Sequence, residues 1–252
     1  MALYDIELIT DNVFEEANDS GVLTVTGTPD TGFPESRLGD RAVSLFWKDT
    51  ATGAYSFEAF LATASSVDFL AVHRHNFSGI AIDWQYDTLA SSSGESYANI
   101  ISQFTPTDNN QIIKTVSTPV ESDAFKLAVA SITNPRCGEI WMGRRYSYQV
   151  MLDAPPPETE LPQVVRVKTL GGPNRFVKRG MAPRTRSYGL RLTDTQRTQF
   201  LTQMVDLDEY SKGFYIRDHQ GEYFPCFLTQ IPVITPINDT LFNVSFAIEE
   251  DL

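Results

Sequence analysis

The sequence contains few residues of the kinds that build disulfide frameworks, metal centres or membrane spans. Among 252 residues there are 2 cysteines and 3 histidines. Two cysteines cannot form a disulfide framework, so Cys137 and Cys226 are expected to be reduced core residues of a chain that folds in a cytosol. No run of 18 apolar residues occurs, so no membrane insertion is expected. The acidic start lacks the basic and apolar regions of a secretory signal.

Motifs for common catalytic chemistry are also missing. The chain has no G-x-S-x-G nucleophile elbow, no H-E-x-x-H and no C-x-x-C motif. Gly171-Gly172 has neither the lysine of a phosphate-binding loop nor the dinucleotide pattern. We therefore expect no catalytic residue and no cofactor, because an enzymatic function has to be argued from a site. A hydrolase that uses scattered carboxylates remains as a minor alternative.

The histidines are the nearest approach to a metal site. His73 and His75 lie two residues apart, which places them on one face of a strand, where a third ligand would complete a zinc site. We favour the simpler interpretation that both form hydrogen bonds at the polar end of a buried strand, and we expect no metal. His219 is expected at a solvated hairpin tip.

Charge is distributed unevenly along this acidic chain. The formal net charge is −12, yet residues 163–197 contain nine basic side chains and one acid, so this window carries +8 and the remainder −20. A DNA site would need interleaved aromatic residues or a helix for the major groove, and the window offers little of either. We expect it to contact the acidic surface of another copy or of a neighbouring protein, with a solvated loop as the second interpretation.

The periodicity of apolar residues predicts a mainly β protein in two parts. Residues 80–86 and 125–130 alternate between apolar and polar side chains, and residues 67–72 and 140–142 are short apolar runs, which is typical of a jelly-roll-type β-sandwich over 1–153. The prolines of residues 154–162 favour an extended linker. Residues 163–252 predict a small β-barrel with one packed helix near 194–211, which Thr193 and Gln196 begin as a capping box.

These features together resemble virion structural proteins of tailed bacteriophages, in particular distal and minor tail proteins. The resemblance rests on the segments 67–79, Trp84, 125–129 and 138–143 in the first part, and on 188–192 and 214–228 in the second. It implies a galactose-binding-like sandwich joined to a barrel similar to those of tail-tube proteins. The expected order, sandwich first and barrel second, is the reverse of that in many distal tail proteins.

The resemblance implies a non-catalytic, structural function in the virion tail. We expect copies made in the host bacterial cytoplasm to form a homo-oligomeric ring at the tail tip, next to tail tube and tail hub proteins, with DNA passing through the lumen. Basic residues expected at the contact between subunits are Arg175, Lys178, Arg179, Arg184 and Arg186. The alternative is a carbohydrate-binding module that recognises a host surface glycan, with Trp84 or Trp141 as the platform for the sugar.

Overall fold

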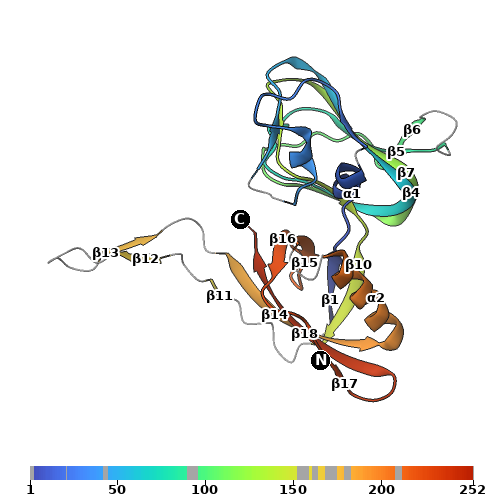
Figure 1. The fold of residues 1–252 in the computed structure, drawn as a ribbon, viewed down its shortest axis with the longest axis vertical. Coiled ribbons are helices and arrows are strands. Elements are labelled where there is room, and N and C mark those ends of the chain that lie inside the picture. Colours follow the sequence, from blue (N-terminus) through green and yellow to red (C-terminus); the bar gives the residue numbers. More distant parts are fainter. Residues whose placement is uncertain are drawn as a thin grey trace. The chain divides into compact units, whose positions relative to one another are not determined.

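The computed structural model describes residues 3–20, 22–41, 45–89, 96–151, 159–160, 164–167, 175–178, 183–207 and 212–251. It is mainly β, as predicted, and divides into two units (Figure 1). We call residues 9–146 the sandwich unit and residues 1–8 with 147–252 the barrel unit. Within the described ranges, no helix is both long and apolar enough to cross a bilayer.

The sandwich unit is built on two long antiparallel strands that are paired with each other. Breaks in their register, for example between Phe60 and Ser65, allow the pair to bend, and both halves contribute side chains to one core. Shorter strands complete a six-stranded sheet in the order β2-β4-β7-β5-β6, with β9 on β4. The elements are α1 (Val13–Ser20), β2 (Leu23–Val25), η1 (Glu35–Leu38), β3 (Trp47–Lys48), β4 (Thr52–Val72), β5 (Ile82–Asp87), β6 (Tyr97–Asn99), β7 (Ile112–Thr133), β8 (Arg136–Cys137) and β9 (Ile140–Gly143).

Alternation of side chains decides which face of this sheet is covered. Phe57, Trp84 and Leu127 occupy neighbouring strands and are completely buried, while the residues between them, such as Asp83 and Lys126, lie on the opposite face. Strands predicted from the period-2 pattern over 80–86 and 125–130 are therefore confirmed.

The barrel unit contains an eight-stranded sheet that closes on itself. Each of β14, β10, β1, β15, β16 and β18 pairs with the next, and β18 returns to pair with β14 from Thr185 to Thr193. Closure removes free sheet edges from this part of the sheet. The strands are β1 (Leu3–Ile9), β10 (Tyr146–Met151), β11 (Thr159–Glu160), β14 (Arg184–Thr193), β15 (Phe214–Arg217), β16 (Tyr223–Leu228), β17 (Val233–Pro236) and β18 (Leu241–Glu250).

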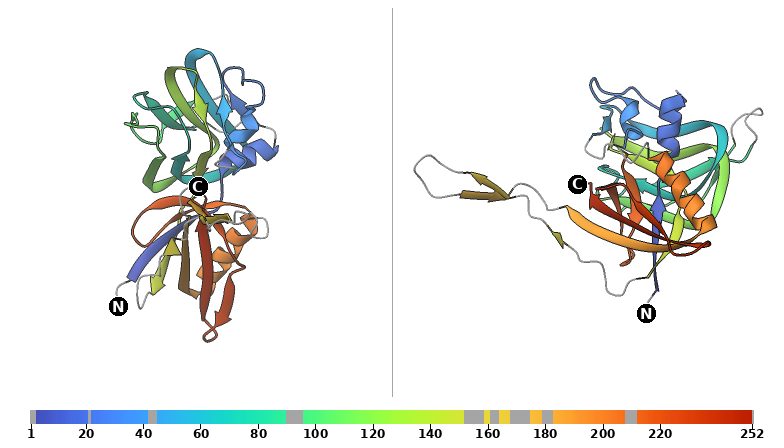
Figure 2. Two further views of the ribbon diagram at one scale, coloured as in Figure 1. Left: turned by 90° about the vertical axis from the view of Figure 1, so that its left-hand side faces the viewer. Right: turned by 60° about the horizontal axis from the view of Figure 1, so that its bottom comes forward.

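One helix packs on the barrel strands, as the sequence predicts. Helix α2 (Asp194–Asp206) lies against β14 and β18 and buries Phe200 and Met204 (Figure 2). Both halves of the predicted capping box are present, since the Thr193 hydroxyl accepts from the Gln196 backbone and the Gln196 side chain accepts from the Thr193 backbone.

The division between the units differs from the expected boundary at residue 153. Strand β1 belongs to the barrel sheet, so the chain begins in the barrel unit, passes through the sandwich unit and returns at residue 147. Of the expected linker, residues 154–162, the structure describes Thr159–Glu160, which pair with β14 in the barrel sheet. The prolines of the expected linker lie outside the described residues.

The basic segment contains a hairpin with its own two-stranded sheet. Strands β12 (Val164–Val167) and β13 (Arg175–Lys178) pair antiparallel, from Val164 opposite Lys178 to Val167 opposite Arg175. Among the strands that the structure describes, neither pairs with any other.

Candidate functional site

Arg186 lies in the interior of the barrel unit and not at its surface. Its side chain is 1% exposed and forms an ion pair with Asp218, which is fully buried. This corrects the expectation that Arg186 contacts another subunit. Arg186 lies two residues before the buried Tyr188 in β14, so both side chains point to the same, inner face of the strand. Burial of the guanidinium becomes tolerable because Asp218 supplies the opposite charge.

Arg184 also has partners within its own unit. Its guanidinium contacts the carboxylates of Glu250 at 2.9 Å and Glu222 at 2.6 Å. Hydrogen bonding to Glu250 raises the pKa of Arg184 further above its usual value. With Arg186, it lies over the ring of Phe224, at 4.6 and 5.4 Å from the ring centroid. Arg184 therefore forms ion pairs within the barrel unit, and its expected role between subunits stays a prediction.

The remaining basic residues expected between subunits lie in or beside the hairpin. Arg175 and Lys178 are the first and last residues of β13. Arg179 lies outside the described residues. The prediction that this segment contacts a neighbour therefore rests on the positions in β13 and on the sequence charge.

Trp84 and Trp141 cannot serve as platforms for a sugar, because both are buried. Their exposed fractions are 0% and 2%. The guanidinium of Arg41 covers one face of Trp141, at 4.8 Å from the ring centroid. Both residues belong to the sandwich core, which corrects the platform assignment; the alternating pattern around Trp84 already indicated an inward-facing side chain.

The histidines of the sandwich unit have structural surroundings. His75 is buried, and its Nδ1 accepts a hydrogen bond from the Phe77 backbone at 3.1 Å. Burial lowers the pKa of His75, which keeps the imidazole neutral and able to accept. Across the described part of the chain, no group of three or more His, Cys, Asp or Glu side chains is arranged to hold a metal. His219 is half-buried, with its ring 6.5 Å from that of Tyr188.

Both cysteines are buried in the cores of their units. Burial raises the pKa of the Cys137 and Cys226 thiols well above the usual value, so neither is ionised at neutral pH. A buried neutral thiol is a poor nucleophile. These thiols act as small apolar side chains.

The residues that follow His75 hold a neighbouring loop in place. The Gly79 backbone donates to the Pro106 carbonyl at 2.8 Å, and the Ser78 hydroxyl donates to the Thr107 carbonyl at 3.0 Å. The Ser78 backbone donates to the Asn109 side chain. Residues 76–79 carry part of the resemblance to phage proteins. Their hydrogen bonds fix the position of the loop over residues 104–110.

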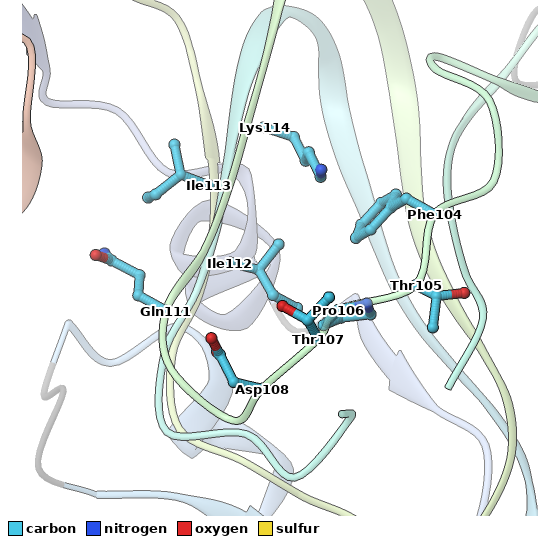
Figure 3. Close-up of a pocket in the computed structure, with 9 residues that line it drawn as sticks. All are labelled: Phe104, Thr105, Pro106, Thr107, Asp108, Gln111, Ile112, Ile113 and Lys114. Carbon is cyan, nitrogen blue, oxygen red and sulfur yellow. The ribbon is translucent and has the colours of Figure 1, made fainter. Parts of the chain in front are cut away.

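This loop and the start of β7 form a pocket of about 300 Å³ on the sandwich unit (Figure 3). Phe104, Pro106 and Ile112 provide apolar surface, and Asp108 and Lys114 provide opposite charges at its rim. The Lys114 ammonium points toward the Phe104 ring and lies 4.7 Å from its centroid. The full lining consists of residues 104–108 and 111–114.

The pocket is chemically suited to a small polar molecule with an apolar face. A partly buried ring beside a cation and a carboxylate can stack against such a molecule and bond its hydroxyl groups. Sequence analysis did not single out Phe104 or Lys114. The contact between these two side chains depends on the β-bridge that joins Phe104 to Ile82 in β5. The sequence around Phe104 has no pattern that predicts this bridge.

Solved structures that are similar to part of this chain include carbohydrate-binding modules. No protein-family model and no curated protein matches the sequence. Chitosan-binding modules 1 and 2 of a chitosanase/glucanase from Paenibacillus sp. IK-5 each align with 53% of this chain, at 14% and 12% identity, and with 99% and 100% of the module. Their TM-scores are 0.44. A family 32 carbohydrate-binding module from Clostridium perfringens NanJ, solved with galactose, covers 55% of this chain and 99% of its own, at 13% identity and a TM-score of 0.41.

Proposed function

We propose that this chain is a non-catalytic structural protein of the tail of a long-tailed bacteriophage, where copies form a ring that continues the tail tube at its tip. The barrel unit provides the ring, and the sandwich unit is carried on it. The proposal is supported by a closed barrel whose first strand precedes the sandwich unit in the chain. Its neighbours would be tail tube and tail hub proteins, in a virion assembled in the host cytoplasm.

The observation that carries the proposal is the basic hairpin β12–β13. A two-stranded hairpin without further strands is at best marginally stable in water, so it gains from a partner. Its strands contain Arg166, Arg175 and Lys178, whereas the chain outside residues 163–197 carries −20. An acidic surface on a second copy offers complementary charge, and repetition of one such contact around an axis closes a ring.

Electron microscopy of the purified full chain tests the proposal. Negative-stain images should show rings of one diameter with a central opening. A variant in which residues 164–178 are replaced by a glycine–serine linker should remain folded and lose the rings. Images of isolated particles at every concentration tried would contradict the proposal. Acidic residues around the central opening of such a ring would repel the phosphates of DNA and let the DNA pass without binding.

The pocket at Phe104 favours a second candidate function, recognition of a host surface glycan by the sandwich unit. Binding of the full chain to a glycan array should be lost in Phe104→Ala and Lys114→Ala, because these changes remove the ring and the cation of the pocket. Val205→Ala, at a residue 75% exposed on α2, is the matched control and should bind normally. Unchanged binding in the two pocket variants would exclude this site.

A further inference from the structure

The exposed face of the sandwich sheet carries a second hollow, whose lining residues are different from those of the Phe104 pocket. A groove of about 430 Å³ runs from Thr26, after β2, across β4 and β7 to Asp83 in β5 and Gln103. It lies on the face opposite the core, because Phe57, Leu127 and Trp84 alternate with its residues along the same strands.

The registers of the strands define the floor of this groove and a polar row beside it, of which Lys126 also lines the groove. Ser56 lies opposite Ala128, and Ala128 lies opposite Asp83, so small side chains form the floor next to one carboxylate. Two residues further along each strand, polar side chains form a row that crosses all five strands of the main path. This row consists of Thr24, Glu58, Lys126, Gln85 and Asn99.

The polar groups along the groove are held in fixed orientations. The Asp83 carboxylate accepts from the Asn99 amide at 3.1 Å and from the Gln103 amide at 3.0 Å. The Gln85 amide donates to the Asn99 carbonyl oxygen at 2.8 Å. Lys126 pairs with Glu58 at 2.8 Å. Groups that are already ordered lose little side-chain entropy when a ligand binds.

We infer that this groove binds an uncharged polysaccharide chain. A carboxylate, amides and hydroxyls in fixed positions can exchange hydrogen bonds with the hydroxyl groups of a sugar, since each has donor or acceptor capacity beyond the bonds described. From β2 to the Phe104 bridge there are four steps between strands of about 4.8 Å each, a length of roughly 19 Å. That length suits several sugar units in a row and exceeds a single one.

Charge and shape exclude other classes of occupant. The charged side chains that line the groove, Asp83 and Lys126, have opposite signs, and the chain has a net charge of −12, which disfavours nucleic acid and acidic glycans. Protein partners usually bury aromatic or large apolar side chains at the centre of an interface. The floor here offers serine and alanine, and the larger lining residues Tyr55 and Val129 are only 4% and 2% exposed.

The inference shares its class of ligand with the second candidate function and differs from it in the site. It does not depend on ring assembly. A chain that forms rings and binds no polysaccharide would therefore leave the assembly proposal standing and overturn this one.

Affinity electrophoresis of the full chain through gels that contain soluble β-glucan, mannan or galactan tests the inference. At least one of these neutral polymers should retard the protein, and polygalacturonate should not. Ala128→Trp fills the floor and Asp83→Ala removes the carboxylate, and each should weaken binding at least tenfold. Ala62→Trp, at an exposed position on β4 outside the groove lining, is the matched control and should stay within twofold.

Two results would overturn the inference. The first is that none of the neutral polymers retards the protein. The second is that Ala128→Trp, shown to be folded by its thermal unfolding curve, binds as tightly as the parent chain. Binding that is lost in Phe104→Ala and kept in Ala128→Trp would assign the sugar to the Phe104 pocket alone.

Discussion

Arg186 and Asp218 form an ion pair inside the barrel unit, with side chains that are 1% and 0% exposed. Asp218 also accepts hydrogen bonds from the backbones of Gln220 and Glu222, which fixes the turn between β15 and β16. The pair thus connects β14 to the β15–β16 hairpin. Arg186, which the sequence analysis assigned to a contact between subunits, instead stabilises the unit that contains it.

Removal of Asp218 should destabilise the barrel unit strongly. Asp218→Ala leaves the Arg186 guanidinium buried without its counter-charge, and loss of one partner of a buried pair costs about 3–5 kcal/mol. Urea unfolding, followed by far-UV circular dichroism, measures the change in the free energy of unfolding. Arg197→Ala, which removes a pair with Asp194 and a contact with the Phe242 ring at a side chain that is 35% exposed, is the control and should cost clearly less than Asp218→Ala. Equal effects of the two changes would contradict the assignment.

Charge reversal in the hairpin should prevent assembly without unfolding the chain. Arg175→Glu, Lys178→Glu and Arg179→Glu together replace attraction to an acidic neighbour by repulsion. Light scattering after gel filtration should then report a single chain with an unchanged circular dichroism spectrum.

The matched control changes the net charge by the same amount in the sandwich unit. Arg74→Glu, Arg136→Glu and Arg144→Glu lie at exposed positions and should leave assembly intact. If both triple variants assemble equally well, the hairpin is not the contact.

Glu139 should make the stability of the sandwich unit depend on pH. Its side chain is buried, accepts from Asn12 at 3.0 Å, and has a pKa raised well above its usual value by burial and by the nearby Asp40 charge. Above pH 4.5 the folded state keeps a proton that the unfolded state has lost, so stability falls as pH rises toward the folded pKa, by up to about 1.4 kcal/mol per pH unit.

Glu139→Gln removes this titration while keeping an oxygen that can accept from Asn12. Unfolding free energies of the two proteins, measured at pH 5, 6, 7 and 8, should diverge in favour of the variant as pH rises. Because His75 titrates in both proteins, the difference between the curves isolates Glu139. Parallel curves would show that Glu139 does not titrate differently on folding.

The capping box at the start of α2 should contribute measurably to stability. Thr193→Ala removes the hydroxyl that accepts from the Gln196 backbone, and loss of an N-cap costs about 1 kcal/mol. Thr193→Ser retains the acceptor and should lie close to the parent in thermal unfolding. A cost shared by the serine variant would point to strand packing instead of capping.

Local patterns in the sequence were sufficient to predict several elements. The alternation of residues 125–130 predicted part of β7, and the Thr193–Gln196 spacing predicted the start of α2. These elements are specified by neighbours within a few residues, either through period-2 burial or through a backbone cap.

The pairing of distant segments could not be predicted in the same way. Ile6 and Leu8 of β1 alternate as any strand does, and only the closed sheet shows that they belong to the barrel unit. The Phe104 pocket and the groove beside Asp83 likewise depend on strand order across residues 24–130. Arg186 was misplaced because a count of charges does not distinguish a surface cation from one that a buried carboxylate neutralises.

The mass of the purified full chain in solution tests the central claim most directly. Native mass spectrometry and light scattering should give one defined species whose mass is an integer multiple of 28.2 kDa, and ring assembly predicts a multiple that persists on dilution. A mass of 28.2 kDa at all concentrations, from a chain shown to be folded, would contradict the account.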